Sequence, residues 1–124
     1  MEGNLKNMKN IYKIMKEKGM EEDIKEWRYY SNYTVLIRAA RSGSEDVLRW
    51  LLNELKLDVN KQNSNGDIAL HSAAFCNQME SARLLLDAGS LQKKNRFGDT
   101  PLDDAKRRGF KEMQVLIESH FQLA

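Results

Sequence analysis

The chain has 124 residues, of which 41% are apolar and 31% charged, with one proline and one cysteine. This length suits one domain with a single core, and the balance of apolar and charged residues argues against wholesale disorder. There is no run of about 18 apolar residues and no apolar signal core after the Lys-rich start, so no membrane span and no secretory signal are predicted. The formal net charge of +2 indicates no particular partner, and the lone Cys76 fits a reducing compartment.

Residues 1–32 are predicted to form a basic amphipathic helix and a degenerate helix pair. Apolar residues recur at helical spacing from Leu5 to Met15, and Gly19 is a natural stop. Residues 22–27 match residues 45–50 in residue class, which favours a capping repeat. The first helix carries five lysines: Lys6, Lys9, Lys13, Lys16 and Lys18. The favoured interpretation is that these lysines form the solvated face of a helix that caps the repeats. The alternative is a free helix that associates with a membrane or an acidic partner.

Three copies of one pattern follow, at about residues 33–63, 64–95 and 96–124. The leucines that mark the first short helix of each copy are 34 and 32 residues apart: Leu36, Leu70 and Leu102. The residues that end this helix keep the same steps: Gly43, Asn77 and Gly109. Steps of this size are typical of stacked repeats, in which each unit buries its apolar face against its neighbours.

Each copy is predicted to contain two helices followed by a turn. In the middle copy these are residues 68–74 and about 79–88, with Gly89 at the left-handed position that ends the second. In the last copy Thr100 is a good N-cap, and Asp103 suits the third helical position. In the first copy Ser44 precedes Glu45 and Asp46, which again predicts a cap with acidic residues in the first turn. Residues 60–66 and 93–98 are Asn- and Gly-containing turn sequences.

Two tryptophans and the leucine-rich positions of the second helices are predicted to form the core rather than a binding site. They are Trp27, Trp50, Leu48, Leu51, Leu52, Leu84, Leu85, Val115 and Leu116.

These repeats resemble the ankyrin-repeat family. The matching motifs are G-D-I-A-L-H-S-A-A at 66–74, G-D-T-P-L at 98–102 and L-D-V-N at 57–60, and the resemblance covers about residues 33–124. It implies a mainly α solenoid of stacked helix-turn-helix pairs joined by short β-hairpin-like loops. The chain departs from the family pattern at Val35 and Ala69, which replace proline, and at Asp103 and Lys106, which replace histidine and alanine. Lys106 fits a polar outer face on a terminal repeat.

Catalysis is not expected, because the sequence offers no phosphate loop, zinc spacing or nucleophile elbow. His71 occupies the family's histidine position, where the resemblance implies a structural bond to loop backbone. The resemblance implies a non-enzymatic protein-interaction module, of the adaptor or inhibitor type, without a cofactor or metal. We expect a monomer in the cytoplasm or nucleus that binds no nucleic acid. The alternative is a regulatory or targeting domain of a larger protein, against which a start Met and a plausible C-terminal cap weigh.

The resemblance also implies where a partner would bind, which is the concave groove and the tips of the loops. The groove positions are Arg41, Phe75, Cys76, Arg107 and Arg108, and the tip positions are Tyr30, Tyr33, Asn65, Asp67, Arg96, Phe97 and Asp99. Phe75 and Phe97 are the sharpest candidates, because neither position needs an aromatic ring for stability. Basic residues around Arg96, Arg107 and Arg108 lead us to expect an acidic segment in the partner.

Overall fold

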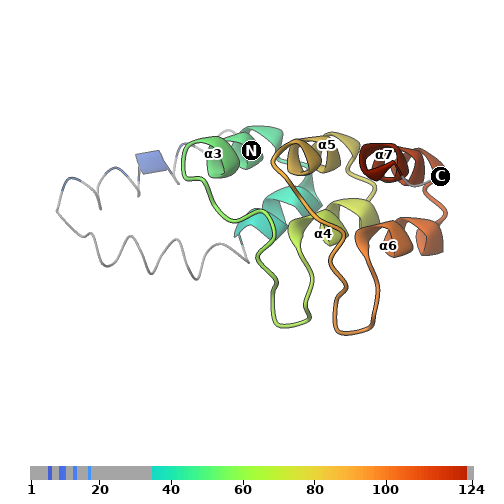
Figure 1. Ribbon diagram of the computed structural model, residues 1–124. Coiled ribbons are helices and arrows are strands. Elements are labelled where there is room, and N and C mark those ends of the chain that lie inside the picture. The colour runs from blue at the N-terminus through green and yellow to red at the C-terminus, as the bar shows by residue number, and fades with distance from the viewer. Residues whose placement is uncertain (1–5, 7–8, 11–12, 14–16, 18–34, 123–124) are drawn as a thin grey trace.

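The repeats form two layers of helices in the computed structural model, which describes residues 6, 9, 10, 13, 17 and 35–122 (Figure 1). The inner layer contains helical residues 35–42, α4 (Ala69–Phe75) and α6 (Pro101–Arg108). The outer layer contains α3 (Glu45–Asn53), α5 (Met79–Asp87) and α7 (Lys111–Phe121). No strand occurs within residues 35–122. The predicted mainly α solenoid is therefore confirmed.

Left-handed residues end each inner helix at the predicted positions. Gly43, Asn77 and Gly109 have φ values of 72°, 55° and 74°. This conformation turns the chain from the inner to the outer layer, and it favours Gly and Asn. Their recurrence therefore builds the same turn three times.

Of the two predicted N-caps, Thr100 caps its helix through its side chain and Ser44 does not. Thr100 Oγ1 accepts from the backbone N–H of Asp103 at 3.2 Å, and Asp103 Oδ2 accepts from the N–H of Thr100 at 2.9 Å, which completes a capping box. Ser44 precedes α3, but its side chain makes no capping bond. Its hydroxyl lies 2.8 Å from that of Ser42 instead, so the prediction that its side chain caps the helix is wrong.

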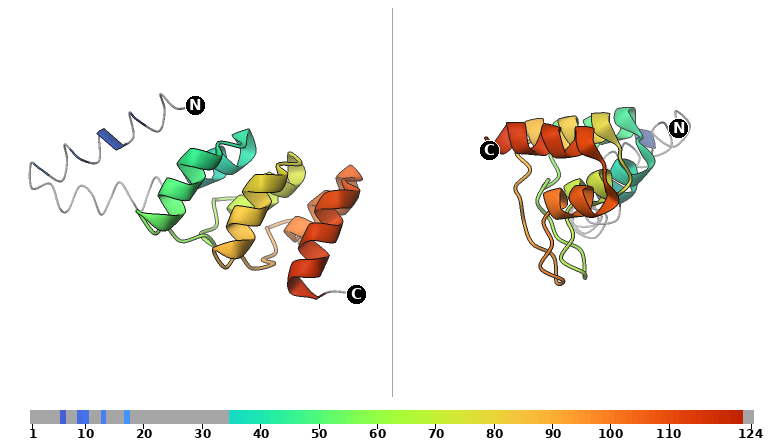
Figure 2. Two further views of the ribbon diagram at one scale, coloured as in Figure 1. Left: turned by 90° about the horizontal axis from the view of Figure 1, so that it is seen from above. Right: turned by 90° about the vertical axis from the view of Figure 1, so that its right-hand side faces the viewer.

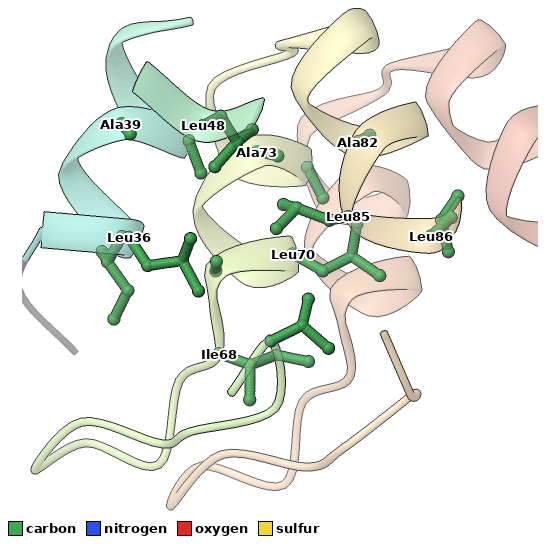
Figure 3. Packing of buried hydrophobic residues seen from close by; sticks show 14 of the residues in the cluster. Leu36, Ala39, Leu48, Ile68, Leu70, Ala73, Ala82, Leu85 and Leu86 are labelled. Carbon is green, nitrogen blue, oxygen red and sulfur yellow. The ribbon is translucent and has the colours of Figure 1, made fainter. Parts of the chain in front are cut away.

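The core lies between the two layers. Leu48, Leu70 and Leu85 are fully buried at its centre, where Figure 3 shows them converging from successive repeats. Ala73 and Ala74 are also fully buried, and their small side chains allow α4 and α6 to pack closely. Each helix pair thus covers the apolar face of the next.

Trp50 is buried as predicted, whereas Val115 is 61% exposed and the prediction that it belongs to the core is wrong. On α7 the buried side chains are Met113 and Ile117, four residues apart. Val115 lies two residues from each, and a helix turns about 100° per residue, so Val115 points away from the core. Trp27 lies outside the described residues.

Two loops extend away from the helices and lie side by side (Figure 2). We call residues 63–67 the first finger and residues 95–99 the second finger. In the first, Asn63 Oδ1 accepts the N–H groups of Asn65 and Asp67. In the second, Asn95 Oδ1 accepts those of Phe97 and Asp99, 32 residues later. An asparagine at the base thus sets the same tight turn in both fingers.

The predicted N-terminal helix and degenerate pair fall almost entirely outside the described residues. Among the residues described there, Lys13 and Glu17 form an exposed ion pair at 4.0 Å. The boundary between residues 1–32 and the repeats therefore stays a prediction. Across the described part of the chain, no helix is long and apolar enough to cross a membrane.

Candidate functional site

The inner helices and the two fingers enclose a hollow of about 260 Å³ on the concave side of the stack. All three repeats contribute to it, since its lining includes Arg41 from the first inner helix, Phe75 from α4 and Arg107 from α6. The full lining is Arg41, Asp67, His71, Ser72, Phe75, Cys76, Asn95, Phe97, Asp99, Asp104 and Arg107. We call this site the hollow.

Two exposed phenylalanine rings face this site from different elements. Phe75 ends α4 and is 45% exposed, and Phe97 sits in the second finger and is 69% exposed. The Arg108 guanidinium lies 4.6 Å from the centre of the Phe75 ring, and that of Arg96 lies 5.0 Å from the Phe97 ring. Each exposed ring therefore makes a cation–π contact with an arginine of this chain.

An arginine joins two aspartates at the C-terminal side of the hollow. Arg107 Nη2 lies 2.6 Å from Asp99 Oδ2, and Arg107 Nη1 lies 3.5 Å from Asp104 Oδ1. The hydrogen bond to Asp99 raises the pKa of Arg107, whereas burial raises the pKa of the Asp104 carboxyl because it disfavours the charged form. The charge of Arg107 is therefore directed inward, toward this chain's own carboxylates.

His71 has the structural role that the resemblance implied. Its Nδ1 accepts the N–H of Ile68 at 3.0 Å, so its Nε2 carries the proton and donates to the backbone oxygen of Asp99 at 2.8 Å. The ring is 2% exposed and ties α4 to the second finger. Both ring nitrogens are occupied, so this histidine shapes the wall of the hollow without offering a free base.

The fingers are also bonded to each other. Asn95 Nδ2 donates to Asp67 Oδ1 at 2.9 Å, and the N–H of Arg96 donates to the carbonyl of Asn65 at 2.9 Å. Arg96 Nη1 further donates to Asn65 Oδ1 at 3.2 Å. These bonds fix the spacing between the fingers, and so fix the shape of the hollow's outer wall.

Most of the predicted binding residues come together here. Seven of them line the hollow: Arg41, Asp67, Phe75, Cys76, Phe97, Asp99 and Arg107. Asn65 and Arg96 bond to each other across the finger tips, and Arg108 lies beside the hollow on Phe75. Tyr30 and Tyr33 lie outside the described residues.

Four lining residues were not among the predicted binding residues: His71, which was expected to be structural, and Ser72, Asn95 and Asp104. Ser72 and Asp104 are 32 residues apart and occupy the same position in successive inner helices, so the repeat register could have identified them together. Asp104 is also three residues before Arg107, the spacing at which side chains meet on a helix. Among the described residues, no group of three His, Cys, Asp or Glu side chains is arranged to hold a metal ion.

Comparison with known proteins agrees with the repeat architecture. A family model described as ankyrin repeats (many copies) matches residues 36–86. Diacylglycerol kinase zeta from Rattus norvegicus is 31% identical over 100 residues, covering 77% of this chain and 11% of that protein. A protein fem-1 homolog A-like from Mus musculus is 32% identical over 96 residues, or 74% of this chain and 14% of that protein. Inversin from Danio rerio is 37% identical over 59 residues, or 47% of this chain and 6% of that protein. The chain therefore spans a small part of these relatives' length.

Proposed function

This chain is an ankyrin-repeat protein, and we propose that it binds a segment of a partner protein in the hollow. Ankyrin repeats are generally protein–protein interaction modules. The observation that carries the proposal is the exposure of Phe75 and Phe97 at one concave site formed by consecutive repeats. Exposed aromatic rings at a concave site are typical of interface hot spots.

Matched variants of the full chain test this proposal. We expect a partner captured from native lysate by the wild-type chain to be lost by the double variant Phe75→Ala/Phe97→Ala. Leu91→Ala is the control, because Leu91 is also apolar and 51% exposed but does not line the hollow. Retention of the same partner by the double variant, with its circular dichroism unchanged, would refute the proposal.

The finer role that we propose is that of a non-catalytic adaptor or inhibitor, in the cytoplasm or nucleus. The half-buried free thiol of Cys76 supports a reducing compartment. Because the chain covers 14% or less of the three relatives described above, a regulatory or targeting domain within a larger protein fits the same binding role. Immunofluorescence of the endogenous protein tests the compartment, and size-exclusion chromatography with light scattering tests the proposed monomer.

We also propose that the partner carries an acidic segment. The different contacts of Arg107 and Arg108 give these two arginines different expected roles. Arg107 pairs with Asp99 and Asp104, whereas Arg108 lies over the rings of Phe75 and Phe110 at 4.6 and 5.4 Å. We therefore assign the acidic contact to Arg108, at the edge of the hollow. Arg108→Gln is expected to weaken the binding of the captured partner, and the salt dependence of that binding, more than Lys56→Gln, a control at an exposed lysine outside the hollow. Equal effects would contradict this assignment.

A further inference from the structure

The hollow itself is acidic, although the chain as a whole is slightly basic. Its lining residues include three aspartates, Asp67, Asp99 and Asp104, against two arginines, a formal charge of −1 with His71 neutral, while Arg96 and Arg108 lie over its two phenylalanine rings. Burial is the main cause that raises the pKa of Asp104; the charges of Asp99 and Asp67 also raise it, whereas His71 and Arg107 lower it. The concave wall and the low exposure of Asp104 strengthen this field, because it is less screened by solvent than at an open surface.

Arg107 shows which kind of group this site accepts. Its guanidinium reaches the carboxylates of Asp99 and Asp104 together, at 2.6 and 3.5 Å. The Arg107 side chain is nevertheless 57% exposed. It occupies the position that a cation from a partner would take at Asp99, so such a cation would displace this guanidinium, the more exposed half of the pair.

Asp67 provides a second contact for an incoming cation. One of its oxygens accepts from the neutral amide of Asn95 at 2.9 Å. Within the described part of the chain, no cation lies within 4 Å of its carboxylate. Phe75 and Phe97 line the same hollow, and aromatic rings attract both a cation and the alkyl stem that carries it.

We infer that the partner segment places an arginine or lysine side chain in the hollow, where Asp67 and Asp99 hold its charge and the two phenylalanine rings hold its stem. This inference rests on the proposed function and names the chemistry of the partner. It is separate from the acidic contact at Arg108, which lies at the edge of the hollow. Charge complementarity of this kind selects among partners and speeds their association.

A random 12-residue peptide display library, selected against the immobilised full chain, tests the inference. We expect the enriched peptides to share an arginine or lysine at one position, next to an apolar or aromatic residue. Synthetic peptides from this set are then titrated against Asp67→Asn, which keeps an oxygen for Asn95 but removes the charge. Binding should weaken about tenfold, and Asp87→Asn, an exposed carboxylate outside the hollow, is the matched control.

The possible outcomes separate this inference from the proposed function. Peptides that lose binding to Phe75→Ala/Phe97→Ala but show no arginine or lysine preference would overturn the inference and leave the hollow as a binding site. An arginine or lysine preference that is unaffected by Asp67→Asn and by Asp99→Asn would also overturn it. If the enriched peptides bind the double phenylalanine variant as tightly as the wild type, the proposed function fails, and the inference fails with it.

Discussion

His71 and Asp103 occupy the same position in successive repeats and perform the same local task with different chemistry. Each accepts the N–H of the residue three before it, at 3.0 Å for Ile68 and 2.9 Å for Thr100. His71 also donates forward to the carbonyl of Asp99 at 2.8 Å, which an ionised aspartate cannot do. Asp103, which replaces the family's histidine, thus accepts the same capping bond but does not donate a bond to the backbone of a finger.

His71→Ala is expected to destabilise the fold by about 2–4 kcal/mol. The change leaves the N–H of Ile68 and the carbonyl of Asp99 without their partner in a buried place. Urea unfolding followed by circular dichroism measures the loss. His120→Ala is the control, because His120 is exposed and should change stability by less than about 0.5 kcal/mol. Equal losses would contradict the structural role of His71.

Asp103 is expected to stabilise the fold in a pH-dependent way. The backbone hydrogen bond from Thr100 lowers the pKa of Asp103 in the folded state. Its contribution is therefore present above the unfolded-state pKa of about 3.9 and is lost as the pH falls through the lower folded value. Asp103→Ala should cost about 1 kcal/mol at pH 7 and less at pH values below about 3. Urea unfolding at both pH values checks this, and a difference that did not shrink at low pH would count against it.

At the scale of elements, the fingers provide a matched pair of glycines. Gly66 and Gly98 have φ values of 79° and 81° and occupy equivalent positions. A Cβ added at Gly66 would lie 3.0 Å from the backbone N of Arg96 and the Cα of Asn95, whereas one added at Gly98 meets nothing within 4 Å. The first finger therefore packs against the second through Gly66.

Both substitutions by alanine should destabilise the chain, since each imposes a left-handed conformation that costs about 1–2 kcal/mol. Gly66→Ala should cost about 1 kcal/mol more, because the second finger must also shift. The difference between the two midpoints of urea unfolding isolates this packing. Equal midpoints would show that the fingers do not hold each other.

The helices differ in how well their sequences predict their ends and their buried faces. The repeated leucines and the Gly or Asn residues at the helix ends predict α4, α5 and α6 closely, because these local signals agree with the packing that each helix adopts. Val115 was misplaced because α7 carries Met113, Val115, Leu116 and Ile117 together, so its apolar residues do not define a single face. The packing of α7 against α5 and α6 selects the buried pair.

At the scale of the whole molecule, hydrogen bonds that step from one repeat to the next complement the apolar stack. Asn60 bonds to the carbonyl of Gly89 and the N–H of Leu91, and Gln78 bonds to the carbonyl of Arg41. The hollow depends on this stacking, since three consecutive repeats supply its lining. Its shape is therefore a property of the assembled repeats.

The resemblance to ankyrin repeats, carried over by repeat register, implied the position of the candidate site, and seven of the predicted residues line one hollow. The arrangement of charges in the hollow could not be predicted in this way. Arg107 bonds to Asp104 within α6 and to Asp99 in the second finger, and the net charge of the chain does not reveal this pairing inside the last repeat. The basic residues of the last repeat led us to expect an acidic partner segment, whereas the folded chain also places three aspartates in the lining, together with Arg41 and Arg107, and Arg108 beside it.

Fluorescence anisotropy of a labelled peptide from the display selection tests most directly whether the hollow is the binding surface. The dissociation constant should rise at least about 30-fold for Phe75→Ala/Phe97→Ala, because two hot-spot rings are truncated. Leu91→Ala should bind like the wild type, since its exposed side chain does not line the hollow. A dissociation constant for the folded double variant within about twofold of the wild type would contradict binding in the hollow.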